Sequence, residues 1–118
     1  MVPCPLSGRK RLKAFISGLF RLEKHQLKEL SYVFCSDPYL LALNRKFLDH
    51  DYYTDILTFP SSYGAGKGVS GEIYISVDRV RENAKNLGHS FRMELHRVIF
   101  HGALHLCQYK DKTKKDKA

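Results

Sequence analysis

One stretch near the end of the chain, from Ser90 to about Leu106, restricts the fold more than any other part of the sequence. Its apolar residues recur at helical spacing, and it leads into the run HGALHLCQYKD, which contains His101 and His105. Residues four apart lie one above the other on the same face of a helix, so two imidazoles at this spacing can share one metal ion. The stretch therefore predicts a helix that carries half of a metal site.

The simplest alternative for this histidine pair is two ordinary polar residues on an apolar helix. The neighbours favour a metal, because a histidine in apolar surroundings needs a polar partner. The apolar residues next to the histidine pair in the sequence are Ile99, Phe100, Leu104 and Leu106. A peptidase helix of the HExxH type would carry a glutamate directly after its first histidine, to take a proton from the metal-bound water. Gly102 occupies that position, which argues against a peptidase and requires a third ligand from elsewhere.

The rest of the chain mixes helices and strands without a regular alternation, which favours an α+β fold. A capping serine and Pro38 predict a helix start, and Gly88 predicts a helix end. Pro60 is expected to stop a strand, and Asp78 to cap a helix. The expected elements are helix 9–23, strand 30–35, helix 39–48, strand 55–59, loop 61–71, strand 72–77 and a helix from 78 to Gly88, between a loose lead-in (1–8) and a frayed basic tail (110–118).

Length and composition indicate a single domain with a basic surface. The 118 residues suffice for one domain, and 20 Lys and Arg against 12 Asp and Glu give a net charge of +8, which suits a polyanion such as nucleic acid. No stretch reaches the roughly 18 apolar residues of a membrane-spanning helix, so no membrane is expected as a partner. The three widely spaced cysteines favour reduced thiols and a cytoplasmic location. The acid-free N-terminus before Glu23 also fits an organelle transit peptide, as an alternative.

Several spaced motifs occur together in one order. The run from His101 to Asp111 resembles the H-G-x-L-H-L-x-G-Y-D-H signature of the bacterial YbeY family of metal-dependent endoribonucleases. Upstream, the segments that match this family are Leu43-Asn44, Asp51, 54–60 (TDILTFP), 71–76 (GEIYIS), Asn83-Ala84 and 89–94 (HSFRME). The similarity covers roughly residues 30 to 111 and is far more specific than any single histidine pair.

The resemblance implies an α+β, zincin-like metal-dependent hydrolase fold, in which a small mixed β-sheet packs against helices around a central metal-binding helix. It implies one zinc ion held by His101, His105 and Asp111, because Asp111 stands where the family has its third histidine. Thr54 and Asp55 would line the site, or else cap a strand. Glu94 would orient a ligand, or else form a surface pair. Aspartate is a competent zinc ligand.

The implied function is a zinc-dependent, single-strand-specific endoribonuclease that acts in maturation of the 16S rRNA 3′ end and in ribosome quality control. Its partners would be ribosomal RNA and ribosomal proteins. Tyrosines can stack on unpaired bases, although structural packing or loop exposure is the more frequent explanation for each of these tyrosines. The candidate tyrosines are Tyr52, Tyr53, Tyr63 and Tyr74.

The chain departs from the family pattern at two positions near the expected site. Gln108 replaces a glycine, which either strains a left-handed turn or leaves the helix to continue. Leu48 replaces an arginine thought to assist at the phosphate, and Arg45 or Lys46 could take that role. These departures, with the short C-terminus, keep a second function open: a noncatalytic RNA- or ribosome-binding module that retains the fold.

Overall fold

The computed structural model describes residues 8–22, 27–60 and 69–117, and beyond Cys107 it describes the path of the backbone. Most of the expected lead-in 1–8, most of the loop 61–71, and Tyr63 lie outside the described residues. Within the described ranges, none of the helices combines the length and the apolar character needed to cross a bilayer.

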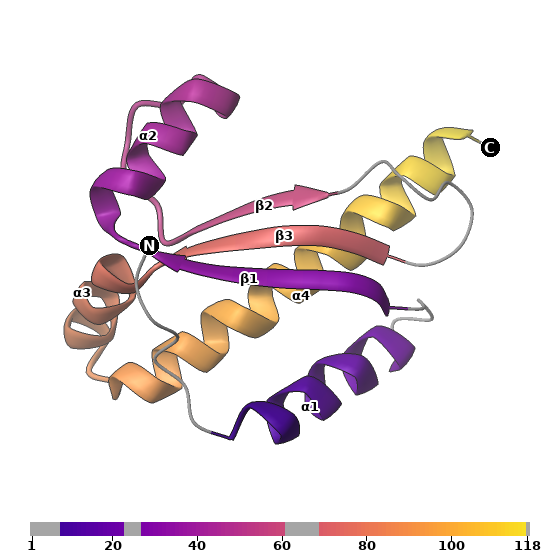
Figure 1. Cartoon of the computed structure of the whole chain (residues 1–118), viewed down its shortest axis with the longest axis horizontal. Helices are drawn as coiled ribbons and strands as arrows, with labels where there is room; N and C mark the ends of the chain where they lie inside the picture. The colour runs from indigo at the N-terminus through magenta and orange to yellow at the C-terminus, as the bar shows by residue number, and fades with distance from the viewer. Residues whose placement is uncertain (1–7, 23–26, 61–68, 118) are drawn as a thin grey trace.

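The described residues form a three-stranded sheet with helices on both faces (Figure 1). The strand order is β1-β3-β2, with β1 parallel to β3 and β2 antiparallel to β3. The expected α+β fold with a small mixed sheet is therefore confirmed. The elements are α1 (Arg9–Leu22), β1 (Leu27–Cys35), α2 (Asp37–Leu48), β2 (Ile56–Pro60), β3 (Val69–Ser76), α3 (Val77–Leu87) and α4 (Phe91–Lys117).

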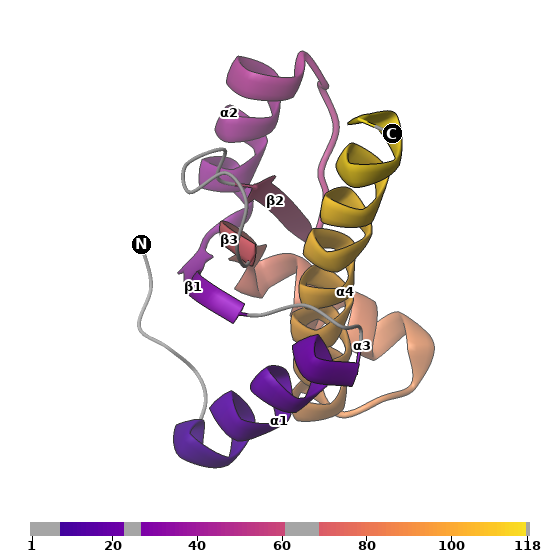
Figure 2. The same ribbon diagram turned by 90° about the vertical axis from the view of Figure 1, so that its right-hand side faces the viewer.

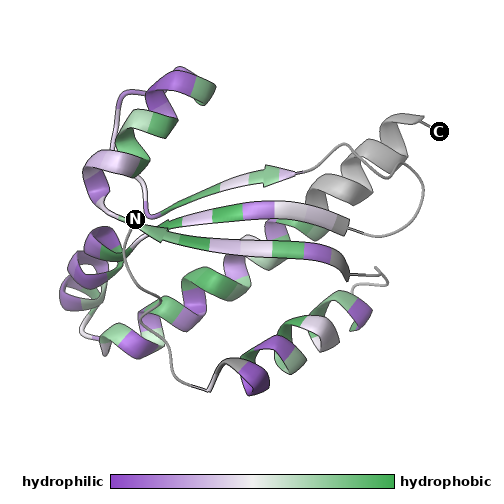
Figure 3. Cartoon of the chain, in the orientation of Figure 1, coloured by the Kyte–Doolittle hydropathy of each residue, from purple (hydrophilic) through white to green (hydrophobic). Residues whose placement is uncertain are grey.

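The two faces of the sheet are covered by different helices (Figures 1 and 2). Alternate residues of a strand point to opposite faces, so Ile73 and Ile75 pack with α1 and α4, whereas Tyr74 packs with α2. The larger core lies between the sheet and α4, where the Tyr32 hydroxyl donates a hydrogen bond to the Ile99 carbonyl at 2.9 Å. Figure 3 shows that the strands and the described part of α4 contain many hydrophobic residues, coloured green.

Two glycines let α4 approach the sheet closely. A Cβ added at Gly102 would lie 2.7 Å from Cδ1 of Ile56, and one added at Gly71 would lie 2.9 Å from a methyl group of Leu106. Both distances are shorter than carbon–carbon contact allows. Gly102 thus brings the histidine-bearing part of α4 directly onto β2 and β3, which fixes the depth of the helix against the sheet.

The strand β2 ends at Pro60, as predicted, and Pro60 itself still pairs with Gly71, because β2 is an edge strand, where a missing N–H costs no ladder bond. Two other expected boundaries are wrong. The cap of α3 is Ser76, whose hydroxyl accepts the Arg79 N–H, and not Asp78. The last helix does not end near Leu106 before a frayed tail: α4 runs to Lys117. Lysine is a good helix former and complements the negative end of the helix dipole.

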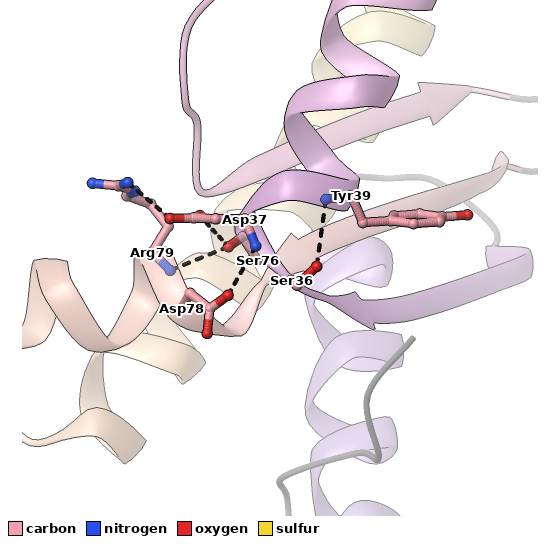
Figure 4. A network of polar contacts seen from close by, with 6 residues as sticks. All are labelled: Ser36, Asp37, Tyr39, Ser76, Asp78 and Arg79. Atoms are coloured by element: carbon pink, nitrogen blue, oxygen red, sulfur yellow. Dashed lines mark hydrogen bonds and ion pairs between the residues drawn. The ribbon is translucent and has the colours of Figure 1, made fainter.

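Each of the helices α2 and α3 places an acidic side chain from its first turn at the N-terminus of the other helix, a reciprocal exchange of contacts (Figure 4). Asp78, in the first turn of α3, accepts the Asp37 N–H of α2 at 2.9 Å. In return, the Asp37 carboxylate accepts the Ser76 hydroxyl and forms an ion pair with Arg79 at 2.8 Å. Each carboxylate lies near the positive end of the other helix, so the exchange stabilises both termini and joins them at one end of the sheet.

Replacing Asp37 by alanine is expected to lower the free energy of unfolding by about 1–3 kcal/mol, because Arg79 would then lose a charged partner in a partly buried position. Urea unfolding measures this change. Glu82→Ala, at an exposed acidic position of α3, is the matched control and should shift stability by less than about 0.5 kcal/mol. Equal effects of the two substitutions would contradict a stabilising role for the exchange.

Candidate metal centre

The two histidines of α4 meet at their outer nitrogens. Nε2 of His105 lies 2.8 Å from Nε2 of His101, and the ring centroids are 4.6 Å apart. Both side chains are exposed, on the flank of a helix whose opposite side is buried against the sheet. Since neutral imidazole nitrogen is a metal donor, this geometry directs two donors to one point at the protein surface.

The third predicted ligand is Asp111, whose side chain lies outside the described residues. The backbone of α4 is helical through Gln108 and Asp111, and among the described residues other than glycine only Asp49 has a positive φ. The continuing-helix alternative for Gln108 is therefore the one observed. Asp111 follows His105 by six residues, or about 9 Å along a helix axis. Among the residues whose side chains are described, no group of three or more His, Cys, Asp or Glu side chains forms a metal site.

Thr54 and Asp55 lie where β2 begins. The Thr54 hydroxyl donates to the Ile56 carbonyl at 3.3 Å, and the Asp55 carbonyl accepts the Ser76 N–H at 3.0 Å. Both residues are half-buried. The pKa of Arg97 on α4 is raised mainly by its hydrogen bonds with Glu94, and the Asp55 carboxylate makes a smaller contribution in the same direction.

Glu94 holds Arg97 and does not contact the histidine pair. The Glu94 side chain is fully buried, and its two oxygens accept hydrogen bonds from Nε and Nη2 of Arg97 at 2.9 and 2.6 Å. Arg97 is half exposed and lies one turn before His101 on the same side of the helix. Sequence reasoning missed Arg97, although its spacing of three from Glu94 and four from His101 was a usable signal.

The Arg97 hydrogen bonds hold the pKa of Glu94 below its usual value, against the opposing effect of burial. A lowered folded-state pKa adds stability above the unfolded pKa of about 4.3, and that stability is lost as pH falls through the folded value. Glu94→Gln should therefore cost about 1–3 kcal/mol at pH 7, with the lower end favoured because Arg97 is half exposed. Urea unfolding should find a smaller difference from wild type near pH 3, and a pH-independent difference would contradict the ion pair.

The basic residues near Leu48 are already engaged. Arg45 forms an ion pair with Asp51, and the Lys46 ammonium lies 5.3 Å from the centre of the Phe47 ring. Leu48 itself is exposed at the end of α2. The structure thus does not bring Arg45 or Lys46 into contact with the histidine pair.

A buried asparagine shapes the segment that follows α2, and sequence reasoning did not identify its role. Asn44 is 1% exposed, and its Nδ2 donates to the Tyr52 carbonyl at 2.9 Å. The main-chain carbonyl of Asn44 accepts the N–H of His50. It also accepts the N–H of Asp49, which adopts a left-handed φ of 55°. Asn44 therefore fixes the path of the chain from α2 to Asp55.

Two further side chains of α4 lie near the pair but do not join it. Cys107 is buried in the core between α4 and the sheet. Nδ1 of His96 lies 2.7 Å from the Arg92 carbonyl of its own helix, and five residues of helix turn His96 away from the face that carries His101.

Comparison with known proteins identifies relatives over almost the whole chain. The profile of the family described as Endoribonuclease YbeY matches residues 8–118. A Cytophaga hutchinsonii protein named Endoribonuclease YbeY is 51% identical over 112 residues, which are 95% of this chain and 78% of that protein. A Porphyromonas gingivalis protein of the same name is 57% identical over 90 residues, or 76% of this chain and 58% of that protein.

A solution structure of a Thermotoga maritima protein is also similar, with a TM-score of 0.58 and 31% identity over 86% of this chain and 67% of that one. Fold and site together define an α+β protein in which two adjoining histidines lie on the exposed flank of the long helix α4. The chain belongs to the endoribonuclease YbeY family.

Proposed function

We propose that this chain is a zinc-dependent endoribonuclease that cleaves single-stranded RNA. The observation that carries the proposal is the 2.8 Å approach of the His101 and His105 Nε2 atoms on the exposed flank of α4. Membership of a family whose named members are endoribonucleases supports the reaction. The net charge of +8 supports a polyanionic substrate.

The donor set suits a single zinc ion. In tetrahedral zinc with Zn–N bonds of about 2.0–2.1 Å, two ligand nitrogens lie roughly 3.3 Å apart, so the imidazoles would need to separate by only about 0.5 Å. Their exposed rings can move that far. Asp111 is proposed as the third protein ligand, which would leave one position open, as in catalytic zinc sites generally. Because the continuous helix places Asp111 about 9 Å beyond His105 along its axis, this role requires the end of α4 to turn back toward the histidine pair when zinc binds. A zincin-like arrangement around α4 is part of this proposal.

The residues of this chain have separate roles in the proposed reaction. Bound zinc would lower the pKa of a water molecule and polarise a phosphoryl oxygen. His101, His105 and Asp111 hold the ion and orient it toward solvent. Glu94 fixes the Arg97 side chain on the same flank of the helix, and Arg97 adds positive charge where an RNA phosphate would approach.

The physiological substrate is proposed to be ribosomal RNA, at the 3′ end of the 16S molecule, in a cytoplasmic setting that includes ribosomal proteins and ribosome quality control. The family resemblance supports this assignment. A second candidate is a noncatalytic RNA- or ribosome-binding module. It is favoured by the exposed apolar Leu48 and by the engagement of Arg45 with Asp51, which leave that part of the site without an available arginine.

Zinc content and strand preference test the proposal together. Elemental analysis of protein purified without chelators should find about one zinc per chain, and the protein should cleave a single-stranded RNA faster than its duplex with a complementary strand. Folded, zinc-loaded protein that binds RNA but leaves both strands intact would favour the noncatalytic module. Folded protein that takes up no zinc would contradict the metal site.

A further inference from the structure

The segment between α2 and β2 presents two neighbouring tyrosine rings to solvent. Tyr52 is 56% exposed and Tyr53 is 53% exposed. The backbone that carries them is held in place, since the Tyr52 carbonyl accepts a hydrogen bond from buried Asn44. Two adjacent aromatic rings on a fixed backbone therefore form a small exposed apolar surface that a ligand can contact.

Each ring is supported by a different side chain on one side. The His50 ring stacks on Tyr52, with centroids 5.1 Å apart and planes at 21°, and the Tyr52 hydroxyl lies 3.0 Å from His50 Nδ1. The Arg79 guanidinium lies 5.0 Å from the centre of the Tyr53 ring and is itself held by Asp37. A planar ring has two faces, so a ring supported on one face and half exposed can offer the other to a ligand.

We propose that Tyr52 and Tyr53 are stacking sites for unpaired bases of a single-stranded RNA. The inference rests on the proposed function, because it assigns to these rings the substrate of the site on α4. Supported, exposed aromatic rings next to cationic side chains are the features by which proteins bind single strands without reading their sequence. Arg79, beside the Tyr53 ring, and Lys46, just before the segment, supply such cations, and the Asp51 charge is offset by its ion pair with Arg45.

The position of the segment fits a strand that continues toward the histidine pair. Three residues after Tyr53 the chain reaches Ile56, whose Cδ1 would lie 2.7 Å from a Cβ added at Gly102, the residue that follows His101. In Figure 2 the segment runs from α2 down to β2 on the same side of the molecule as α4. Bases held at Tyr52 and Tyr53 would therefore restrain an RNA strand whose backbone passes the paired imidazoles.

Binding of a fluorescein-labelled, unstructured oligouridine, measured by anisotropy, tests this inference. The double variant Tyr52→Ala/Tyr53→Ala should bind about 10-fold to 100-fold more weakly than wild type, whereas Tyr52→Phe/Tyr53→Phe should bind within about 3-fold of it. The dependence of the dissociation constant on salt should stay the same, since stacking neutralises no phosphate. The matched control is Tyr39→Ala, a tyrosine 43% exposed on α2, which should leave binding unchanged.

An oligouridine that lacks bases at two central positions supplies the second arm. Wild type should bind this oligonucleotide more weakly than the intact one. The alanine double variant should bind the two oligonucleotides about equally, because the rings and the missing bases belong to one interaction. Wild type that binds RNA while the alanine variant binds equally well would overturn the stacking sites and leave the nuclease proposal standing. Wild type that fails to bind single-stranded RNA would overturn both.

Discussion

His105→Ala is expected to abolish zinc retention and RNA cleavage together. The substitution removes one of two nitrogens that meet at 2.8 Å, and no described Cys, Asp or Glu completes a cluster that could replace it. Loss of the ion would remove several kcal/mol of transition-state stabilisation, so cleavage should fall by about 10²–10⁴-fold. Because His105 is exposed, the free energy of unfolding of the zinc-free protein should change by less than about 0.5 kcal/mol.

His96→Ala is the matched control for this substitution. His96 lies on the same helix, and its Nδ1 lies 2.7 Å from the Arg92 carbonyl, away from the pair. This variant should retain zinc and cleavage within about 3-fold of wild type. Cleavage that survives His105→Ala in a zinc-replete assay would show that the reaction does not depend on the pair.

Gly102→Glu is expected to have the largest effect on stability. The first carbon of the new side chain would lie 2.7 Å from Ile56 Cδ1 and 3.1 Å from Ile73, so α4 would have to move away from the sheet. Overpacking costs about 1–3 kcal/mol, and burying an unpaired carboxylate adds several more. Because domains of this size are stable by only about 5–15 kcal/mol, much of the protein should be unfolded.

Two further variants separate the steric part of this effect from the charge. Gly102→Ala adds only the Cβ and should still cost about 1–3 kcal/mol. Gly18→Ala, in α1, meets no atom within 4 Å and should stabilise the protein by about 0.5–1 kcal/mol through helix propensity. Circular dichroism with urea unfolding measures all three. A stable Gly102→Glu protein would contradict the close packing of α4 on the sheet.

Gly102 also illustrates what sequence could and could not predict. The sequence indicated correctly that this position lacks the glutamate of a peptidase, but the reason is visible only in the structure, where the residue faces two isoleucines of the sheet. Local signals served well elsewhere. The Ser36 hydroxyl caps α2, and Gly88 ends α3 with a φ of 72°, both as predicted.

Some features of the fold depend on residues that are distant in the sequence, and these could not be predicted from local signals. Asp78 does not cap its own helix. Its carboxylate accepts a hydrogen bond from the N–H of Asp37, which belongs to α2. The parallel pairing of β1 with β3 likewise arises from contacts between segments far apart in the chain.

The candidate site was also predicted from the sequence only in part. The helical spacing of His101 and His105 predicted that the imidazoles meet, and their Nε2 atoms do so. The link between Arg97 and buried Glu94 was missed, because spacing alone does not reveal which acid is buried. Asp111 stays a predicted ligand, with α4 continuing through its position.

X-ray absorption at the zinc edge, on purified protein and on its Asp111→Ala variant, tests the paired-histidine site most directly. Wild type should show two imidazole nitrogens at about 2.0–2.1 Å with oxygen ligands completing four-coordination, and Asp111→Ala should keep the imidazoles while binding zinc more weakly. A zinc-replete protein without bound zinc, or a spectrum without imidazole ligands, would contradict a metal centre at His101 and His105.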